Sequence, residues 1–193
     1  MKNQKSKINF TFLFFTFFFI FTQSVEAISF IFETEKDYLL KKEFSIKIKI
    51  DPKEKVINTI NFKLSFNSEF LEFVGFNREN SIISLWIKEP ETVENKISFS
   101  GGIPNGFRGI FIGTPLEANE LLEIKFRKKK EISREEIEKG FILKSEIFLN
   151  NEKGESFEIK DFSFKEEKFF DEDFAILSGI LYNGIKWKIE KVF

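Results

Sequence analysis

Short segments in which apolar and polar residues alternate recur along this chain, and they constrain its fold more than any other feature. In residues 44–50, Phe and Ile occupy every second position and alternate with Ser and Lys. Residues 56–66 repeat the pattern over a longer stretch, with apolar residues at positions 60, 62, 64 and 66. A period of two places apolar side chains on one face of a β-strand and polar ones on the other. The chain therefore predicts strands that bury one face each.

Further strand candidates follow, with turn residues between them, at 28–32, 70–76, 81–87, 97–100, 120–126, 141–149, 155–159 and 162–164. One short helix is indicated near 133–139, because Ser133 and Glu136 have the spacing of a capping box and Gly140 can end a helix. About nine short strands and almost no helix predict an all-β fold, an antiparallel β-sandwich. We expect this domain to span residues 28–165.

The stretch from 84 to 108 stands out in a chain composed mostly of Ile, Lys, Phe and Glu. Gly101-Gly102 and Pro104-Asn105-Gly106 carry turn chemistry, so we expect a long Gly/Pro loop from residue 101 to residue 119. The candidate binding residues in this loop are Asn105, Phe107 and Arg108. Trp86 lies in an apolar strand, where core packing is the simpler interpretation of a tryptophan.

Composition excludes several classes of function. The 193 residues contain no Cys and no His, which removes Cys nucleophiles, disulfides, thiolate or imidazole metal sites and Ser-His triads. Lys+Arg 30 against Asp+Glu 31 gives a net charge of -1, without the basic excess typical of nucleic-acid binders. No carboxylate pair is distinguished by its spacing, so we predict neither an enzyme nor a cofactor. Asn150, Asn151 and Glu152 offer oxygen ligands for calcium, but a plain turn is the simpler interpretation of these residues.

The N-terminus has the pattern of a secretory signal peptide, residues 1–27. Lys2, Lys5 and Lys7 precede the apolar run 8–21, and a V-x-A cleavage pattern ends at Ala27, before Ile28. As a helix this run would reach about 21 Å, less than the hydrocarbon core of about 30 Å. Cleavage is therefore favoured over a permanent anchor, and a secreted or cell-surface protein is expected.

Residues 166–193 differ from the rest and form a C-terminal extension. Apolar runs lie on either side of Asn183-Gly184, the strongest short signal for a β-hairpin, and Trp187 is a further candidate binding aromatic. An isolated hairpin is marginally stable in water. It would dock on the sandwich, bind a partner or lie on a membrane. Membrane contact is expected only here or through an uncleaved signal peptide.

Three segments carry a family resemblance: F-K-L-S-F-N-S-E-F-L-E-F-V-G-F, S-L-W-I-K-E-P and K-I-S-F-S-G-G-I-P-N-G-F. With L-L-E-I-K-F and F-I-L-K-S-E-I-F-L-N-N-E-K-G, they resemble a cohesin domain of a bacterial surface-protein branch. Cohesins are jelly-roll sandwiches related to family-3 carbohydrate-binding modules. The resemblance covers residues 46–164 and implies a jelly-roll topology and a non-catalytic binding module.

The resemblance also implies a partner and a face. Cohesins bind dockerin modules through one sheet face, so the partner would be a dockerin-like protein. The strands 56–66 and 97–100 would contribute outward residues to it: Thr59, Asn61, Lys63, Ser98 and Ser100. Simple exposure to solvent explains these residues equally well. Polysaccharide binding is the alternative, and it would need exposed aromatics that stack on sugar rings, with Trp86, Phe107, Tyr182 and Trp187 as candidates.

Overall fold

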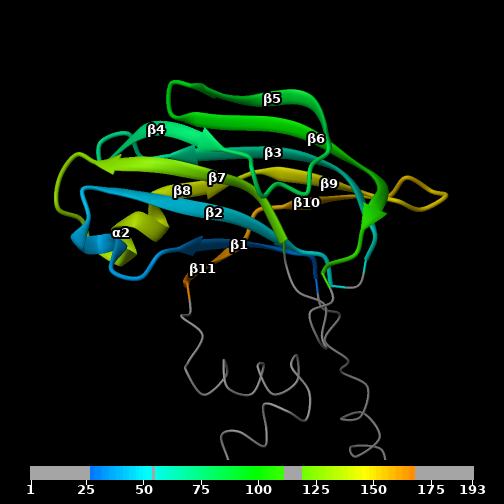
Figure 1. Ribbon diagram of the computed structural model, residues 1–193, viewed down its shortest axis with the longest axis horizontal. Helices are drawn as coiled ribbons and strands as arrows, with labels where there is room; N and C mark the ends of the chain where they lie inside the picture. The colour runs from blue at the N-terminus through cyan, green and yellow to red at the C-terminus, as the bar shows by residue number, and fades with distance from the viewer. Residues whose placement is uncertain (1–26, 54, 111–118, 168–193) are drawn as a thin grey trace, which may run out of the picture.

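Two β-sheets pack face to face in this protein (Figure 1). The structure is a computed structural model that describes residues 27–53, 55–110 and 119–167. The first sheet has the order β11-β1-β2-β7-β4, with bounds Phe162–Glu166, Ser29–Thr34, Glu43–Asp51, Asn119–Lys128 and Leu71–Asn77. The second has the order β10-β9-β3-β6-β5, with bounds Ser156–Ile159, Ser145–Leu149, Ile57–Phe66, Lys96–Phe107 and Leu85–Val93. A further strand, β8 (Phe141–Leu143), also pairs with β3.

The core fills the space between the sheets with the apolar residues of the alternating segments. Phe62 of β3 is fully buried, meets the ring of Phe30 of β1 edge-on at 5.6 Å, and stacks on Phe99 of β6 at 4.7 Å. Phe126 of β7 contacts Phe66 of β3 at 5.3 Å. Aromatic pairs in these geometries add to the free energy gained by burial. The predicted β-sandwich is thus confirmed.

The predicted helix is also confirmed, as α2 (Arg134–Lys139), which lies at one end of the sandwich (Figure 1). The Ser133 side chain accepts a hydrogen bond from the Glu136 amide, and the Glu136 carboxylate accepts one from the Ser133 amide. The Ser133 amide and the Ser133 hydroxyl both donate to the Glu136 carboxylate, and these two bonds lower the pKa of that carboxyl. Gly140 ends the helix. A 3-10 turn, η1 (Tyr38–Leu40), lies between β1 and β2.

Several sequence expectations were wrong in detail. Residues 101–107 are not a loop: β6 continues through them, with residues 103–106 forming a bulge opposite Asn58. Asn105 and Gly106 have positive φ there, of 74° and 77°, so the turn chemistry bends a strand instead of reversing the chain. Residues 81–84 precede β5, which continues through Pro90. The described strands number eleven, and β1 and β11 run parallel within an otherwise antiparallel arrangement.

The predictions for the two ends of the chain fall largely outside the described residues. This applies to residues 1–26 of the predicted signal peptide, to the C-terminal hairpin and to Trp187. At the expected cleavage site, Ala27 is exposed and Ile28 is buried in the core. Within the described part of the chain, no helix is long and apolar enough to cross a membrane.

The buried carboxylate of Glu120 leads to a testable prediction about stability. Glu120 of β7 is 6% exposed, and its Oε1 has no hydrogen-bond partner. Burial raises the pKa of this carboxyl, so folding penalises its charged form. We expect Glu120→Gln to raise the free energy of unfolding at pH 7 by about 1 kcal/mol. Since protonation removes the penalty, the gain should shrink as the pH falls through the raised pKa towards the ordinary carboxyl range.

Urea unfolding at neutral and acidic pH measures this effect. Glu72→Gln is the control, because the Glu72 carboxylate forms an ion pair with Arg127 at 3.1 Å and its neutralisation should bring no gain. A gain at Glu120 that does not depend on pH would contradict the explanation.

Candidate binding face

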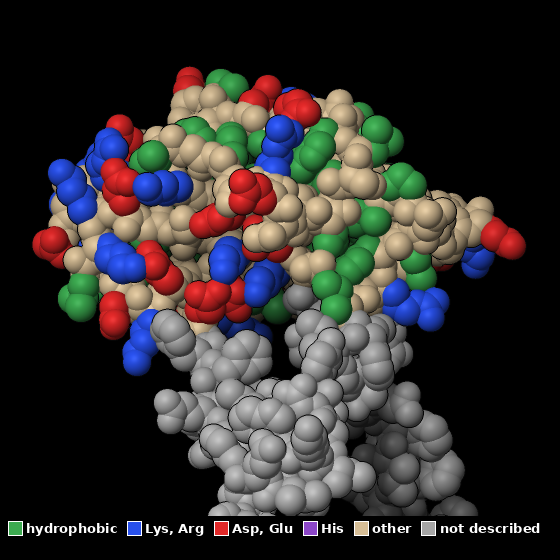
Figure 2. Space-filling view, in the orientation of Figure 1, with side chains coloured by type: hydrophobic (Ala, Val, Ile, Leu, Met, Phe, Trp, Pro, Cys, Tyr) green, Lys and Arg blue, Asp and Glu red, His purple; other side chains and the backbone are tan. Residues whose placement is uncertain are grey.

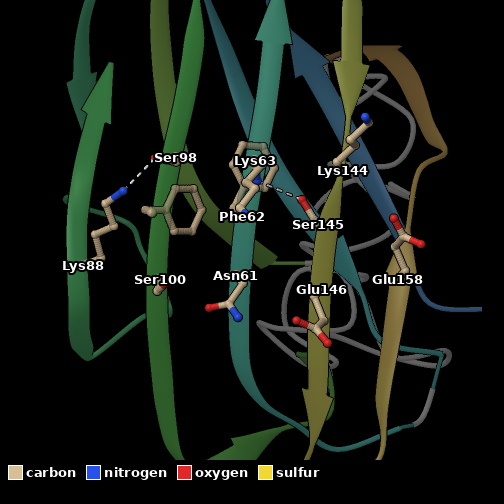
Figure 3. Close-up of a pocket in the computed structure, with 11 residues that line it drawn as sticks. Asn61, Phe62, Lys63, Lys88, Ser98, Ser100, Lys144, Ser145, Glu146 and Glu158 are labelled. Atoms are coloured by element: carbon tan, nitrogen blue, oxygen red, sulfur yellow. Dashed lines mark hydrogen bonds between the residues drawn. The ribbon is translucent and has the colours of Figure 1, made fainter. Parts of the chain in front are cut away.

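A shallow depression lies on the outer face of the second sheet, opposite the core (Figure 3). It encloses about 550 Å³ and extends over β10, β9, β3, β6 and β5. Its polar and charged lining residues are Asn61, Lys63, Lys88, Ser98, Ser100, Lys144, Ser145, Glu146 and Glu158. We call this set the candidate binding face.

Alternation along the strands explains how the face is built. In β3, Phe62 and Leu64 are buried in the core, so Asn61 and Lys63 point outward. In β6 the two neighbours of Phe99 point outward for the same reason, and Ser98 and Ser100 lie opposite Lys63 and Asn61 in the ladder. Glu146 of β9 lies opposite Asn61 on the other side of β3. The candidate binding face therefore has short polar side chains near its centre and charged side chains around them.

Four of the five sheet residues predicted from the sequence line this depression: Asn61, Lys63, Ser98 and Ser100. The fifth, Thr59, lies one step along β3, beside the bulge and opposite Gly102, and its hydroxyl donates to the Asn58 side chain. The structure brings the predicted sheet residues together, and their binding role stays a prediction.

The predicted loop and aromatic residues lie elsewhere. Trp86 packs against the core, edge-on to Phe99 at 5.6 Å, with Arg78 over its ring. Phe107 ends β6 and is also partly buried against the core, while Asn105 and Arg108 are exposed. These residues do not line the depression. Asn150 and Asn151 belong to the turn between β9 and β10, and no cluster suited to a metal occurs among the described residues.

Sequence reasoning missed the charged residues that β5, β10 and the β8–β9 segment contribute, namely Lys88, Lys144, Glu146 and Glu158. Their outward position follows from alternation, but their place beside β3 depends on the strand order of the sheet. On β5, Lys88 forms an ion pair with Glu91 at 2.5 Å and donates to the Ser98 hydroxyl at 3.2 Å. The hydrogen bond from Lys88 lowers the pKa of the Glu91 carboxyl.

Charges on the outer face of the first sheet are arranged differently. Arg127 of β7 forms ion pairs with Glu43 of β2 at 2.8 Å and with Glu72 of β4 at 3.1 Å. Those hydrogen bonds raise the pKa of the Arg127 guanidinium. Lys47 of β2 pairs with Glu167 at 2.6 Å. On the face seen in Figure 2, positive and negative side chains are interspersed, with no large field of one sign.

On the candidate binding face, by contrast, Lys63, Lys144 and Glu146 form no ion pair with any described residue. Large apolar side chains are exposed in strands of the same sheet. Leu85 and Val93 of β5 are 55% and 60% exposed, and Ile142 of β8 is 59% exposed. Unpaired charge and exposed apolar area thus occur together on the second sheet.

No family model matches the chain, and no curated protein matches it. The structure is similar to several solved structures, and each similarity extends over most of this chain and most of the other protein. One is a non-cellulosomal cohesin from the archaeon Archaeoglobus fulgidus, at 14% identity over 72% of this chain and 87% of that one, with a TM-score of 0.42.

A second is the sixth cohesin of scaffoldin B from Acetivibrio cellulolyticus, solved in complex with a dockerin. It is 10% identical over 74% of this chain and 100% of that one, with a TM-score of 0.43. A third is a type II cohesin from Bacteroides cellulosolvens, at 12% identity over 72% and 95%, with a TM-score of 0.44. All three are cohesin modules. They belong to the family that the sequence segments resemble.

Proposed function

We propose that this protein is a secreted or cell-surface, non-catalytic module of the cohesin type, and that it holds a dockerin-like protein on the candidate binding face. The observation that carries the proposal is the contrast between the two outer sheet faces. Arg127, Lys125 and Lys47 on the first sheet are ion-paired, whereas the second sheet leaves Lys63, Lys144 and Glu146 without an ion pair among the described residues, around a shallow depression with exposed apolar side chains nearby. Interfaces combine apolar area with polar groups that find partners on binding.

The sequence resemblance supports the choice of partner, because cohesins bind dockerins through one sheet face. The N-terminal pattern of Lys residues, apolar run and small-residue site supports export. Polysaccharide binding is less well supported, since Trp86 and Phe107 are both partly buried against the core and do not line the depression.

The test uses a panel of purified dockerin modules, including those encoded by the same organism, with the full chain immobilised. We expect at least one dockerin to bind, and Ser100→Arg at the centre of the depression to weaken that binding roughly tenfold or more. Ser45→Arg is the matched control, because Ser45 lies on β2 of the opposite sheet and is also partly exposed.

Two results would count against the proposal. Equal losses for both variants would show that the candidate face is not the binding surface. Retention on insoluble polysaccharide, without binding to any dockerin, would favour the carbohydrate alternative.

A further inference from the structure

Like charges lie side by side on the candidate binding face. The Lys144 amide, just before β9, donates to the Lys63 carbonyl oxygen of β3 at 2.9 Å, so the two lysines lie at the same level of the sheet, and both side chains are exposed. Glu146 of β9 lies directly opposite Glu158 of β10. The lysine pair and the glutamate pair are two residues apart along the chain, or about 7 Å. Figure 3 shows all four side chains on the same face of the sheet.

This arrangement is unfavourable in the free protein. Like charges directly opposite each other destabilise neighbouring strands, whereas opposite charges stabilise them. The first sheet follows the stabilising pattern, with Arg127 placed between Glu43 and Glu72. On the second sheet, Glu158 pairs only with Lys160, at 3.0 Å, among the residues that the structure describes. The lysine pair and Glu146 therefore keep their charges available to a partner.

We propose that the partner presents an acidic group to Lys63 and Lys144 and, next to it, a basic group to Glu146 and Glu158. This inference rests on the proposed function as a protein-binding face, and it specifies the charge pattern of the bound surface. Charges that are desolvated in an interface are stabilised only when the partner supplies the opposite charge. A pattern of two signs also fixes the orientation of the partner, which a single-sign patch does not.

The shape of the face favours a different protein over a second copy of this chain. A two-fold axis could place the lysine pair of one copy against the glutamate pair of another. However, the lining residues surround a depression of about 550 Å³, and two such concave faces would enclose a gap. A partner with a convex surface fills the depression and reaches both pairs.

Two peptides serve as probes that do not depend on a known partner: tetraglutamate and tetralysine, titrated into the full chain and followed by amide chemical shifts. We expect tetraglutamate to shift amides around Lys63 and Lys144, and tetralysine to shift those around Glu146 and Glu158. Both effects should largely vanish at 1 M salt, where the screening length falls to about 3 Å. Lys144→Glu should weaken tetraglutamate binding at this place about tenfold.

Lys125→Glu is the matched control, because Lys125 lies on the first sheet and already pairs with Glu43 at 2.8 Å. It should leave tetraglutamate binding at the candidate face unchanged. Thermal unfolding adds a second measurement. Lys144→Gln removes the repulsion with Lys63 without adding a carboxylate beside Glu146, and it should raise Tm by about 1–3 °C, whereas Lys125→Gln breaks an ion pair and should lower it.

The outcomes separate this inference from the proposed function. If no dockerin binds but the peptides bind at the two pairs, the charge pattern stands and the choice of a dockerin is wrong. If a dockerin binds while the peptides bind elsewhere, or Lys144→Gln lowers Tm, the charge pattern is overturned and the binding function stands. A concentration-dependent dimer that Lys144→Glu abolishes would also overturn it, because the face would then bind a second copy.

Discussion

Replacing Phe62 by alanine is expected to lower the free energy of unfolding by about 3–5 kcal/mol. Phe62 is 0% exposed and stacks on Phe99, with their ring planes 16° apart. It also contacts Phe30 across the space between the two sheets. Truncation removes both contacts and leaves a cavity that β3, the centre of its sheet, cannot collapse to fill. Since the free energy of unfolding of a typical domain is about 5–15 kcal/mol, this loss would be a large fraction of it.

Urea unfolding of the wild-type chain and the variant measures this loss. Asn61→Ala is the control, because Asn61 is the preceding residue in the same strand and points outward. Its effect should stay within about 0.5 kcal/mol. A loss below about 1 kcal/mol for Phe62→Ala would mean that the two sheets pack less tightly around this ring than the structure shows.

The position of Phe62 also shows which part of the fold the sequence could predict. Each sheet of the sandwich has one buried and one solvated face, so alternation marks both the strand and the direction of its side chains. This is why β2 and β3 were predicted nearly to their ends, and why four residues of the candidate face were predicted correctly as outward. The helix could also be predicted from the sequence, because a capping box is a local pattern.

Strand order is not local, and this limited the prediction of the site. The repulsive pairs of the candidate face exist because β9 lies beside β3 and β10 lies beside β9. In the sequence, Lys63 and Lys144 are ordinary polar residues of two strand candidates that lie far apart along the chain. Nothing in either strand alone distinguishes them from solvated lysines.

The Gly/Pro-rich stretch was misinterpreted for a related reason. Gly and Asn at positive φ are used both in turns and in strand bulges, and the sequence does not distinguish the two. In the structure, β6 continues past Gly101 and Gly102, pairs with β3 and β5, and bends only at the bulge of residues 103–106. Pairing with both neighbours as far as Gly102, and with β3 again at Phe107, keeps the strand continuous where the local chemistry indicated a loop.

The bulge in β6 leads to a second prediction of a large loss of stability, for a substitution at Gly106. Gly106 has φ of +77°, and a Cβ at this position would meet the Val56 side chain and lie 3.0 Å from Asn150 Nδ2. The backbones that carry these side chains are joined to each other, because the Asn150 backbone amide donates to the Val56 carbonyl oxygen at 2.8 Å. We expect Gly106→Ala to lower the free energy of unfolding by about 2–4 kcal/mol, combining the cost of positive φ with that of overpacking.

Two other glycines separate these costs in urea unfolding. Gly154 also has positive φ, of +59°, but a Cβ added there would have no heavy atom within 4 Å, so Gly154→Ala should show the conformational cost alone, about 1–2 kcal/mol. Gly75 has neither constraint, and Gly75→Ala should be close to neutral. If Gly106→Ala costs no more than Gly154→Ala, the contacts with Val56 and Asn150 do not restrict the bulge. A larger loss at Gly106 would mean that the end of β6 is held against both neighbours, as its pairing with Ile57 through Phe107 requires.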